Sequence, residues 1–164
     1  WARDGAKASD LCKRLSLRGL SATPCADVTS ATSGADIVVT TTPATSPLLH
    51  AAQSGQHITA MGSDAEHKNE IKPGLLKLAY YVADRLSQTR ILGELHHAIA
   101  AGIVSGEQDF PELGQIIAGT SPGRADREAI TIADLTGTGI QDTAIASLAV
   151  SRARAAGTGQ SFTV

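Results

Sequence analysis

Near the middle of the chain stands the sequence Ile58-Thr59-Ala60-Met61-Gly62-Ser63-Asp64-Ala65-Glu66-His67-Lys68-Asn69-Glu70, in which a short apolar strand leads directly into a dense set of ionisable side chains. In open sheets of parallel strands, ligands bind outside the carboxyl ends of the strands, where loops present polar groups to a crevice. A strand that ends in Gly-Ser-Asp therefore predicts the mouth of a ligand site, with Asp64 at its edge.

Two residues beside Asp64 support that interpretation, and a simpler one competes with it. Gly62 lets the backbone pass close to a ligand, and Asp64 can cap a helix that begins near Ala65 while still offering a carboxylate oxygen to substrate. Lys68 lies four residues further on, on the same face of that helix. Taken alone, the pattern is better explained by an ordinary N-cap that pairs with Lys68 at the surface.

The start of the chain has the pattern of a strand followed by a helix. Trp1 to Asp4 resembles the tail of a strand that ends in an acidic residue, and residues 5–18 follow a helical pattern. This order is typical of the second βα unit of a dinucleotide-binding fold, whose first unit would carry a Gly-rich phosphate loop. Because neither that unit nor an initiator Met precedes Trp1 in this sequence, we expect the 164 residues to be part of a longer enzyme.

Composition fits a soluble α/β domain and argues against two classes of partner. The 164 residues are 42% hydrophobic and 18% charged, which is enough chain for one buried core. The formal net charge of −2 provides no basic surface for nucleic acid or for an anionic membrane. No apolar run approaches the roughly 20 residues of a membrane span. We therefore expect neither nucleic acid nor a membrane as partner.

Cysteine and histidine spacing gives no sign of a metal site. Cys12 and Cys25 lack metal-ligand spacing. They are expected to be buried free thiols in a reducing cytoplasm, with a disulfide as the alternative. His96 and His97 are adjacent, so their side chains point in different directions and cannot bind one metal ion from the same helical face. We expect no metal and a cytoplasmic protein.

Apolar strands alternate with helical patterns along the chain, which predicts a parallel sheet covered by helices. The β-branched run at 35–42 is predicted to be a fully buried strand that stops at Pro43, because proline cannot donate to a ladder. Further strands are expected at 20–25, 57–61, 80–84 and 129–134. Helices are expected at 5–18, 47–54, 66–79, 86–101, 110–118 and 140–156, the last with a strongly apolar face, and a polar turn or short helix at 27–33.

Two further strand ends carry the same kinds of residue as the central one. Thr41 and Thr42 place hydroxyls and free backbone N–H groups after the β-branched strand, either beside a dinucleotide or in an ordinary Thr-rich turn. After the last strand, Gly137-Thr138-Gly139 enters a helix whose N-terminus can hold an anionic group, or else lets strand and helix pack closely. Because the carboxyl ends of parallel strands meet at one edge, we expect Thr41, Gly62 and Thr136 to line one crevice.

Four segments of the sequence together resemble the ornithine cyclodeaminase/μ-crystallin family. The sequence of the segment at 60–70 is most similar to the ectoine-utilisation cyclodeaminase-like branch of that family. The four segments are Ala35-Asp36-Ile37-Val38-Val39-Thr40-Thr41-Thr42-Pro43, Ala60-Met61-Gly62-Ser63-Asp64-Ala65-Glu66-His67-Lys68-Asn69-Glu70, Gly93-Glu94, and Asp134-Leu135-Thr136-Gly137-Thr138-Gly139-Ile140-Gln141-Asp142. The resemblance covers nearly all of the chain. It implies an α/β fold, with a partial Rossmann-type parallel sheet and flanking helices over residues 1–142, and without the first βα unit. Residues 143–164 would then form a C-terminal helix and tail that return toward a separate substrate and dimerisation domain.

The resemblance also implies a reaction. In the family, tightly held NAD takes a hydride from the α-carbon of an amino acid; an internal amine attacks the resulting imine, ammonia leaves, and the same hydride returns to the cyclic product. Asp64 stands at the position of the family's catalytic acid/base, able to relay protons from the attacking or departing amine. A carboxylate enclosed in an apolar crevice would have its pKa raised toward the working range, although a cationic substrate would oppose that change.

Other candidate site residues follow from the same resemblance. Lys68 would lie beside Asp64 and contact the substrate. Asp4 could accept a hydrogen bond from the ribose 2′-hydroxyl of NAD, whereas Arg3 could pair with the 2′-phosphate of NADP. The family likeness favours NAD and leaves NADP open. The full set of candidate cofactor-binding residues is Arg3, Asp4, Thr41, Thr42, Pro43, Gly62, Ser63, Thr136 and Gly137, the last two at the nicotinamide end.

Three classes of function remain open. The first is an NAD-dependent cyclodeaminase that acts on a small diamino acid, ornithine-like or ectoine-derived, and that is a homodimer when full length. The second is an amino-acid dehydrogenase or ketimine reductase on the same scaffold, since fold and cofactor do not determine the reaction. The third is a non-catalytic, crystallin-like dinucleotide-binding protein, against which the presence of Asp64 speaks. The 164 residues alone should be inactive, because part of the substrate contacts would come from the preceding half.

Overall fold

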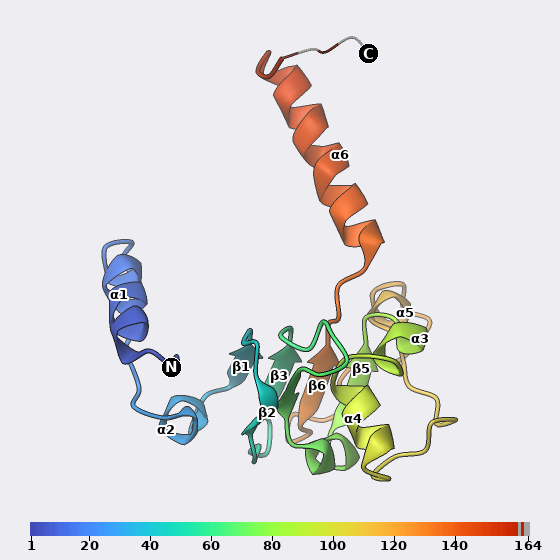
Figure 1. Ribbon diagram of the computed structural model, residues 1–164. Helices are drawn as coiled ribbons and strands as arrows, with labels where there is room; N and C mark the ends of the chain where they lie inside the picture. The colour runs from blue at the N-terminus through green and yellow to red at the C-terminus, as the bar shows by residue number, and fades with distance from the viewer. Residues whose placement is uncertain (161, 163–164) are drawn as a thin grey trace.

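The computed structural model describes residues 1–160 and 162, and in them a four-stranded parallel sheet forms the core (Figure 1). Across the sheet the strands follow the order β1 (Ile37–Thr40), β3 (His57–Ala60), β6 (Thr131–Asp134) and β5 (Tyr80–Ala83). The register places the last residues of these strands level with one another. All four carboxyl ends therefore lie along one edge of the sheet.

Strands β3, β5 and β6 confirm the strands predicted at 57–61, 80–84 and 129–134. Ile58 and Ile132 lie side by side on β3 and β6 and are fully buried. Tyr81 of β5 is also buried and packs edge-on against Phe110, with 4.9 Å between the ring centroids. These residues form the centre of the hydrophobic core.

Strand β1 is half-buried, which corrects the prediction of a fully buried strand at 35–42. Val38 and Thr40 are buried, whereas Ile37 and Val39 are 65% and 56% exposed. β1 ends the sheet order, so it pairs with β3 on one edge and with no other strand in the part of the chain described. A strand that packs on one face only shows alternating rather than continuous burial.

A short second ladder stands where two helices were predicted. β2 (Thr45–Leu49) pairs in parallel with β4 (Asn69–Ile71). The helix predicted at 47–54 is therefore wrong. Leu49 and Ile71 are partners in this ladder and both are almost completely buried, so pairing with a distant segment prevails over local helical spacing.

The helix predicted at 66–79 is also wrong, because β4 occupies its first part and the 3-10 helix η1 (Pro73–Lys77) its second. Proline fits the first turn of a helix but not its interior, so Pro73 begins η1 and separates it from the preceding residues. η1 buries Leu75 and Leu76 in the core.

The helix predicted at 86–101 is two short helices, α3 (Leu86–Thr89) and α4 (Glu94–Ala100). Gly93 separates them with a φ of 89°, a conformation that glycine adopts without steric cost. A side chain at Gly93 would also collide with Asp134, because its Cβ would lie 2.9 Å from the Oδ2 atom. The break lets α4 pack against η1 and β4.

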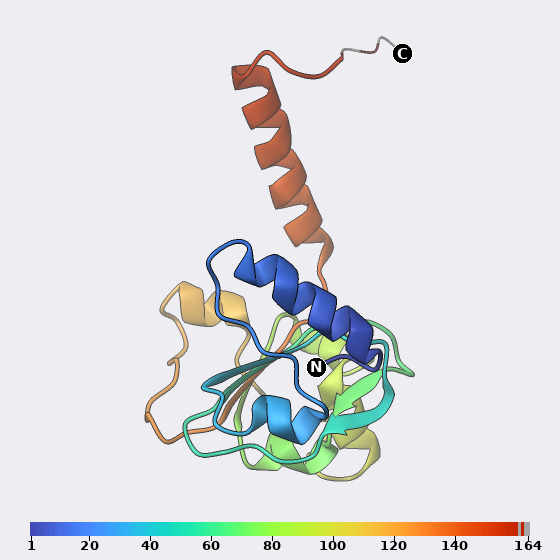
Figure 2. The ribbon, with the colours of Figure 1, turned by 90° about the vertical axis from the view of Figure 1, so that its left-hand side faces the viewer.

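The helices predicted at 5–18 and 110–118 are confirmed as α1 (Gly5–Ser16) and α5 (Leu113–Ile117). Residues 27–33, predicted as a polar turn or a short helix, contain the short helix α2 (Val28–Thr32). α1 and α2 lie on the β1 side of the sheet (Figures 1 and 2). The strand predicted at 20–25 and the strand tail predicted at Trp1 to Asp4 are wrong, since these residues pair with no strand among those described. Backbone groups without a ladder partner are best exposed to water, and the segment is an irregular connection.

Helix α6 (Gly139–Ala155) confirms the helix predicted at 140–156 and projects away from the sheet (Figure 1). The strongly apolar face predicted for it is wrong. Its larger apolar residues are distributed around the helix axis rather than along one side, and all of them are exposed: Ile140, Ile145, Leu148 and Val150.

Candidate functional site

The three predicted strand ends meet at one edge of the sheet. Thr40, Ala60 and Asp134, the last residues of β1, β3 and β6, are level across the sheet. The loops that begin at Thr41, Met61 and Leu135 therefore leave the sheet side by side. Thr41, Gly62 and Thr136 thus lie at one edge of the sheet, as predicted. A cavity at this edge is lined by Thr41 and Thr42 but not by Gly62 or Thr136, so a single crevice shared by all three stays a prediction.

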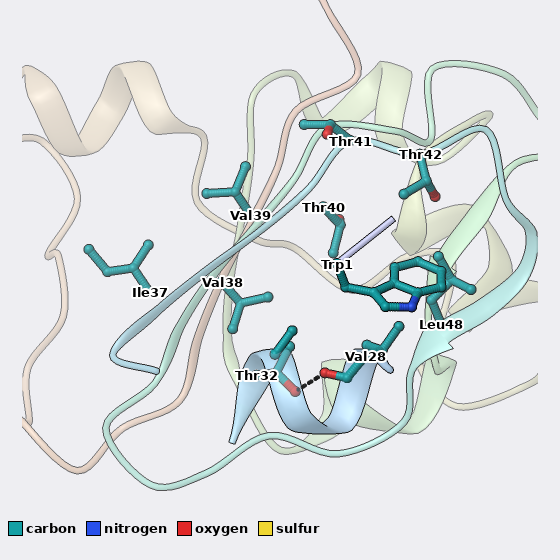
Figure 3. A pocket seen from close by; sticks show the side chains of 11 residues that line it. Trp1, Val28, Thr32, Ile37, Val38, Val39, Thr40, Thr41, Thr42 and Leu48 are labelled. Carbon is teal, nitrogen blue, oxygen red and sulfur yellow. Dashed lines mark hydrogen bonds between the residues drawn. The ribbon is translucent and has the colours of Figure 1, made fainter. Parts of the chain in front are cut away.

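A cavity of about 250 Å³ runs along β1 and ends at the first of these loops. Thr41 and Thr42 line it at the carboxyl end of the strand, and the Trp1 ring lies near Thr40 and Thr42 (Figure 3). Thr40 also lines the cavity, and its hydroxyl is buried without a hydrogen-bond partner in the described part of the chain. A buried polar group of this kind is normally satisfied by a partner, which a ligand in the cavity could provide.

Two loops at this edge are joined by the side chain of Glu70. Its carboxylate accepts hydrogen bonds from the backbone N–H of Thr42 and from that of Gly62, the latter at 2.8 Å. Glu70 is fully buried. A Cβ at Gly62 would lie 2.3 Å from the Glu70 Cδ atom and 2.3 Å from the Thr42 carbonyl oxygen. The close approach of a carboxylate and of a neighbouring loop is therefore enough to require glycine at position 62.

Ser63, the next residue of the turn, is also anchored inside the protein. Its hydroxyl donates a hydrogen bond to Glu94, the first residue of α4. Glu94 is fully buried and accepts three more hydrogen bonds, from the Asn69 side chain and from the backbone N–H groups of Glu70 and Ile71, at 2.9–3.1 Å. Burial raises the pKa of Glu94, and the hydrogen bond from Ser63 opposes this most strongly.

Asp64 follows these two anchored residues and turns outward. Its side chain is 56% exposed and forms an ion pair with Lys68, whose side chain is 25% exposed. The pairing predicted for these two residues is confirmed, but no helix carries it. Residues 61–68 form turns and an irregular segment that ends at β4, so the prediction that Asp64 caps a helix beginning near Ala65 is wrong.

The electrostatics of Asp64 also differ from expectation. The hydrogen bond from Lys68 holds the pKa of this carboxyl below its ordinary value of 3.8. The predicted rise needed a carboxylate enclosed among apolar groups, whereas here the side chain is largely in water and faces an ammonium group. Asp64 is therefore ionised at neutral pH in this structure.

The third strand end is held by Asp84, which sequence reasoning missed. Its carboxylate accepts from the backbone N–H groups of Thr136 and Gly137, at 2.8 and 3.0 Å, and from the Thr136 hydroxyl at 2.9 Å. Gln88 donates to the Gly137 carbonyl oxygen at 2.7 Å. An acidic residue directly after the buried strand β5 was the available signal, because that position lies at the same edge as Thr41 and Gly62.

Asp134, the last residue of β6, is a second acid that the sequence did not reveal as part of this edge. Its Oδ2 atom accepts from the Tyr81 hydroxyl at 2.7 Å and from the first two N–H groups of α4, those of Glu94 and Leu95, at 2.8 and 3.1 Å. Its Oδ1 atom is buried without a partner among the described residues. Burial raises the pKa of Asp134 to about 7.

The N-terminal candidates, Arg3 and Asp4, follow Trp1, which lines the β1 cavity. Asp4 is the N-cap of α1 and accepts a hydrogen bond from the backbone N–H of Ala6 at 2.9 Å. Arg3 and Asp4 are both exposed. Because Trp1 lines the same cavity as Thr41 and Thr42, the structure places this segment on the same side of the sheet as the first loop.

The structure also bears on the cysteines, on metal-binding groups and on membrane-spanning helices. Cys12 and Cys25 are free and half-buried, rather than fully buried as predicted. Within residues 1–160 and 162, no group of three or more His, Cys, Asp and Glu side chains is arranged to hold a metal ion. Nor is any helix in these residues long and apolar enough to cross a membrane.

Comparison with known proteins identifies close relatives over almost the whole chain. The sequence profile of the ornithine cyclodeaminase/mu-crystallin family matches residues 1–157. A Rhizobium meliloti (strain 1021) protein, provisionally named a dehydrogenase, is 59% identical over 99% of this chain and 50% of its own length. An uncharacterized cyclodeaminase of Sinorhizobium fredii (strain NBRC 101917 / NGR234) is 56% identical over 99% of this chain and 50% of its own length. The chain thus spans about half the length of these relatives.

A solved structure has the same fold. The iminosuccinate reductase of Paracoccus denitrificans in complex with NAD⁺ superimposes with a TM-score of 0.90 at 35% identity, over 100% of this chain and 51% of the reductase. The parallel sheet and its flanking helices therefore match half of an NAD-bound enzyme.

Proposed function

The chain belongs to the ornithine cyclodeaminase/mu-crystallin family, and from that membership we propose that the whole protein is an NAD-dependent enzyme that acts on a small amino acid. More specifically, we propose a cyclodeaminase that converts a diamino acid, ornithine-like or ectoine-derived, into a cyclic imino acid with release of ammonia. The observation that carries this proposal is the Asp64 carboxylate, which stands at the carboxyl edge of the sheet on an anchored turn and faces Lys68.

The residues at this edge fit NAD. The unpaired Thr40 hydroxyl lies in a cavity that ends at Thr41 and Thr42. In our proposal the loop from Thr41 to Pro43 and the turn at Gly62 and Ser63 hold the dinucleotide. Thr136 and Gly137, which Asp84 holds in place, lie at its nicotinamide end. When bound, NAD supplies a reversible hydride acceptor for the α-carbon of the amino acid.

Asp64 is the proposed acid/base. Because Lys68 holds its pKa low, the carboxylate is ionised near neutral pH and can accept a proton from the amine that attacks. It can then return that proton to the amine that leaves as ammonia. In the same proposal Lys68 keeps the carboxylate in place and contacts the substrate. The rest of the substrate site would lie in the half of the protein that this chain does not span.

Asp4 and Arg3 are proposed to flank the adenosine ribose, with NAD favoured over NADP. Asp4 is fixed as the N-cap of α1, so its carboxylate has a defined direction at the start of the helix. A carboxylate accepts a hydrogen bond from a 2′-hydroxyl and repels a 2′-phosphate. Arg3 would be the group that accommodates the phosphate if NADP were used.

The test is Asp64→Asn in the whole protein, supplied with ornithine and separately with diaminobutyrate. Ammonia and reduced nicotinamide are followed together. The wild type should release ammonia without net NADH. Asp64→Asn should lose ammonia release by roughly 10²–10⁴-fold, the usual contribution of a positioned acid/base, while binding of NAD is kept because the side chain has the same size. Glu66→Gln, an exposed change two residues away, should leave both unchanged. An Asp64→Asn variant that releases ammonia at the wild-type rate contradicts the assigned role.

A second candidate function is an amino-acid dehydrogenase or ketimine reductase. The relative named a dehydrogenase and the iminosuccinate reductase structure favour it. Net NADH formed in step with ammonia would select it over the cyclodeaminase. A protein that binds NAD but turns over none of these amino acids would fit the non-catalytic, crystallin-like class instead.

We also propose an assembly and a location. Helix α6 exposes several large apolar side chains and projects from the sheet, which suits packing against further protein. We propose that residues 143–164 return to a second domain and that the whole protein is a homodimer. The two free thiols suit a reducing cytoplasm.

A further inference from the structure

The turn that carries Asp64 is held by two buried carboxylates rather than by secondary structure. Residues 61–64 belong to no helix or strand. The backbone N–H of Gly62 donates to Glu70, and the hydroxyl of Ser63 donates to Glu94. Each of the two residues before Asp64 is therefore attached to a separate, fully buried acid.

Glu94 and Glu70 are linked to each other by a hydrogen bond. Glu94 accepts from the backbone N–H of Glu70 at 2.9 Å, and so fixes the residue whose side chain holds Gly62. Glu70 also accepts from the N–H of Thr42, in the loop after β1. The position of the Asp64 turn and that of the Thr42 loop are thus set by one connected group, which ties the ends of two neighbouring strands to β4 and α4.

The carboxylates of Glu70 and Glu94 act as acceptors in all six of the hydrogen bonds that they form with the described residues. A carboxylate offers acceptors on both oxygens, whereas a glutamine of the same size would replace one oxygen by a donor. That donor would face another N–H or O–H. The geometry therefore selects glutamate specifically, and a change to glutamine alters the contacts without leaving a cavity.

From this arrangement we propose that Glu70 and Glu94 are positioning residues, which orient the Asp64 carboxylate and the Thr42 loop with respect to cofactor and substrate. The proposal rests on the proposed function for its link to turnover. A purely structural role would lower stability alone. A positioning role also changes the affinity for NAD and the turnover of protein that is fully folded.

The experiment compares Glu70→Gln with Glu66→Gln in the whole protein, at a temperature where circular dichroism shows both to be folded. Glu66 is exposed in the same segment, so Glu66→Gln is the same chemical substitution away from the buried Glu70 and Glu94 carboxylates. For Glu70→Gln the Kd for NAD should rise about tenfold, the size of one lost hydrogen bond. Its kcat should fall roughly 100-fold, as expected when a reacting group is displaced by about 1 Å. KM should change less, because Asp64 acts in the transition state.

The outcomes separate this proposal from the proposed function. If the wild type turns over neither diamino acid, the proposed function fails, and the Kd for NAD alone decides the positioning role. A folded Glu70→Gln variant whose Kd for NAD and kcat match those of Glu66→Gln overturns the positioning role. If Glu70→Gln does not fold, Ser63→Ala decides instead, because the buried Ser63 hydroxyl donates to Glu94 and its loss removes the link from Glu94 to the turn. A Ser63→Ala protein with unchanged kcat and unchanged Kd then overturns the proposal.

Discussion

Replacing Gly62 with alanine should be one of the most destabilising single-methyl changes in this chain. The added Cβ would lie 2.3 Å from both the Glu70 Cδ atom and the Thr42 carbonyl oxygen, far inside van der Waals contact. One of these contacts is backbone, which cannot rotate away. The Glu70 carboxylate must therefore retreat, although it is fully buried and has no solvent to move into.

The magnitude follows from the hydrogen bonds that Glu70 would lose. Its carboxylate satisfies the backbone N–H groups of Thr42 and Gly62. Leaving a buried donor unsatisfied costs about 1–3 kcal/mol, so two of them give roughly 2–6 kcal/mol. Natural domains are stable by only about 5–15 kcal/mol in total. With a urea m-value of about 3 kcal/mol/M, the unfolding midpoint should fall by roughly 0.7–2 M.

The assay is urea unfolding of the whole protein, followed by circular dichroism at one protein concentration. The matched control is Gly114→Ala in α5, where an added Cβ meets no atom within 4 Å. Alanine is favoured over glycine in a helix by about 0.5–1 kcal/mol, so this control should be neutral or slightly stabilising. A Gly62→Ala protein that unfolds at the same urea concentration as Gly114→Ala would refute the close approach of Glu70 to Gly62.

Two other changes test the buried acid Asp134 and the cofactor preference. Burial raises the pKa of Asp134 from 3.8 to about 7, so its contribution to the free energy of unfolding is present below about pH 4 and is lost as the pH rises through 7. The loss is about 4 kcal/mol. The side chain of Asp134→Asn cannot ionise. The difference in unfolding free energy between wild type and variant should therefore change by about 4 kcal/mol between pH 4 and pH 7. A difference that stays constant over these pH values contradicts a raised pKa for Asp134. Asp4→Ser keeps an N-cap for α1 but removes the charge, so calorimetric titration should find the preference for NAD over NADP reduced roughly tenfold; an unchanged ratio of the two Kd values places Asp4 away from the ribose.

Much of the arrangement of strand ends could be predicted because it depends on local patterns. The apolar runs at 57–61, 80–84 and 129–134 each read as strands without reference to any partner, and parallel strands necessarily bring their carboxyl ends to one edge. With the strand predicted at 35–42, this was sufficient to place Thr41, Gly62 and Thr136 at that edge. The pair formed by Asp64 and Lys68 was also predicted, although from their spacing on a helix that the structure does not contain.

Two of the errors arise from contacts with segments distant in sequence. A helix was predicted at 47–54, but its first residues belong to strand β2 (Thr45–Leu49), because Leu49 and Ile71 are ladder partners and bury each other. The helix expected at 86–101 breaks at Gly93 because Asp134, at the end of another strand, occupies the space that a side chain would need.

By itself, the sequence determined that this is a parallel α/β protein, that its polar loops share one edge, and that Asp64 stands among them. Only the tertiary structure decided which groups hold those loops. The acids concerned accept from donors far along the chain: 28 residues separate Glu70 from Thr42, 31 separate Glu94 from Ser63, and 52 separate Asp84 from Thr136. An acidic residue in a sequence gives no sign of whether it will face water or a buried N–H, because burial of a carboxylate depends on donors that only the folded chain brings within reach.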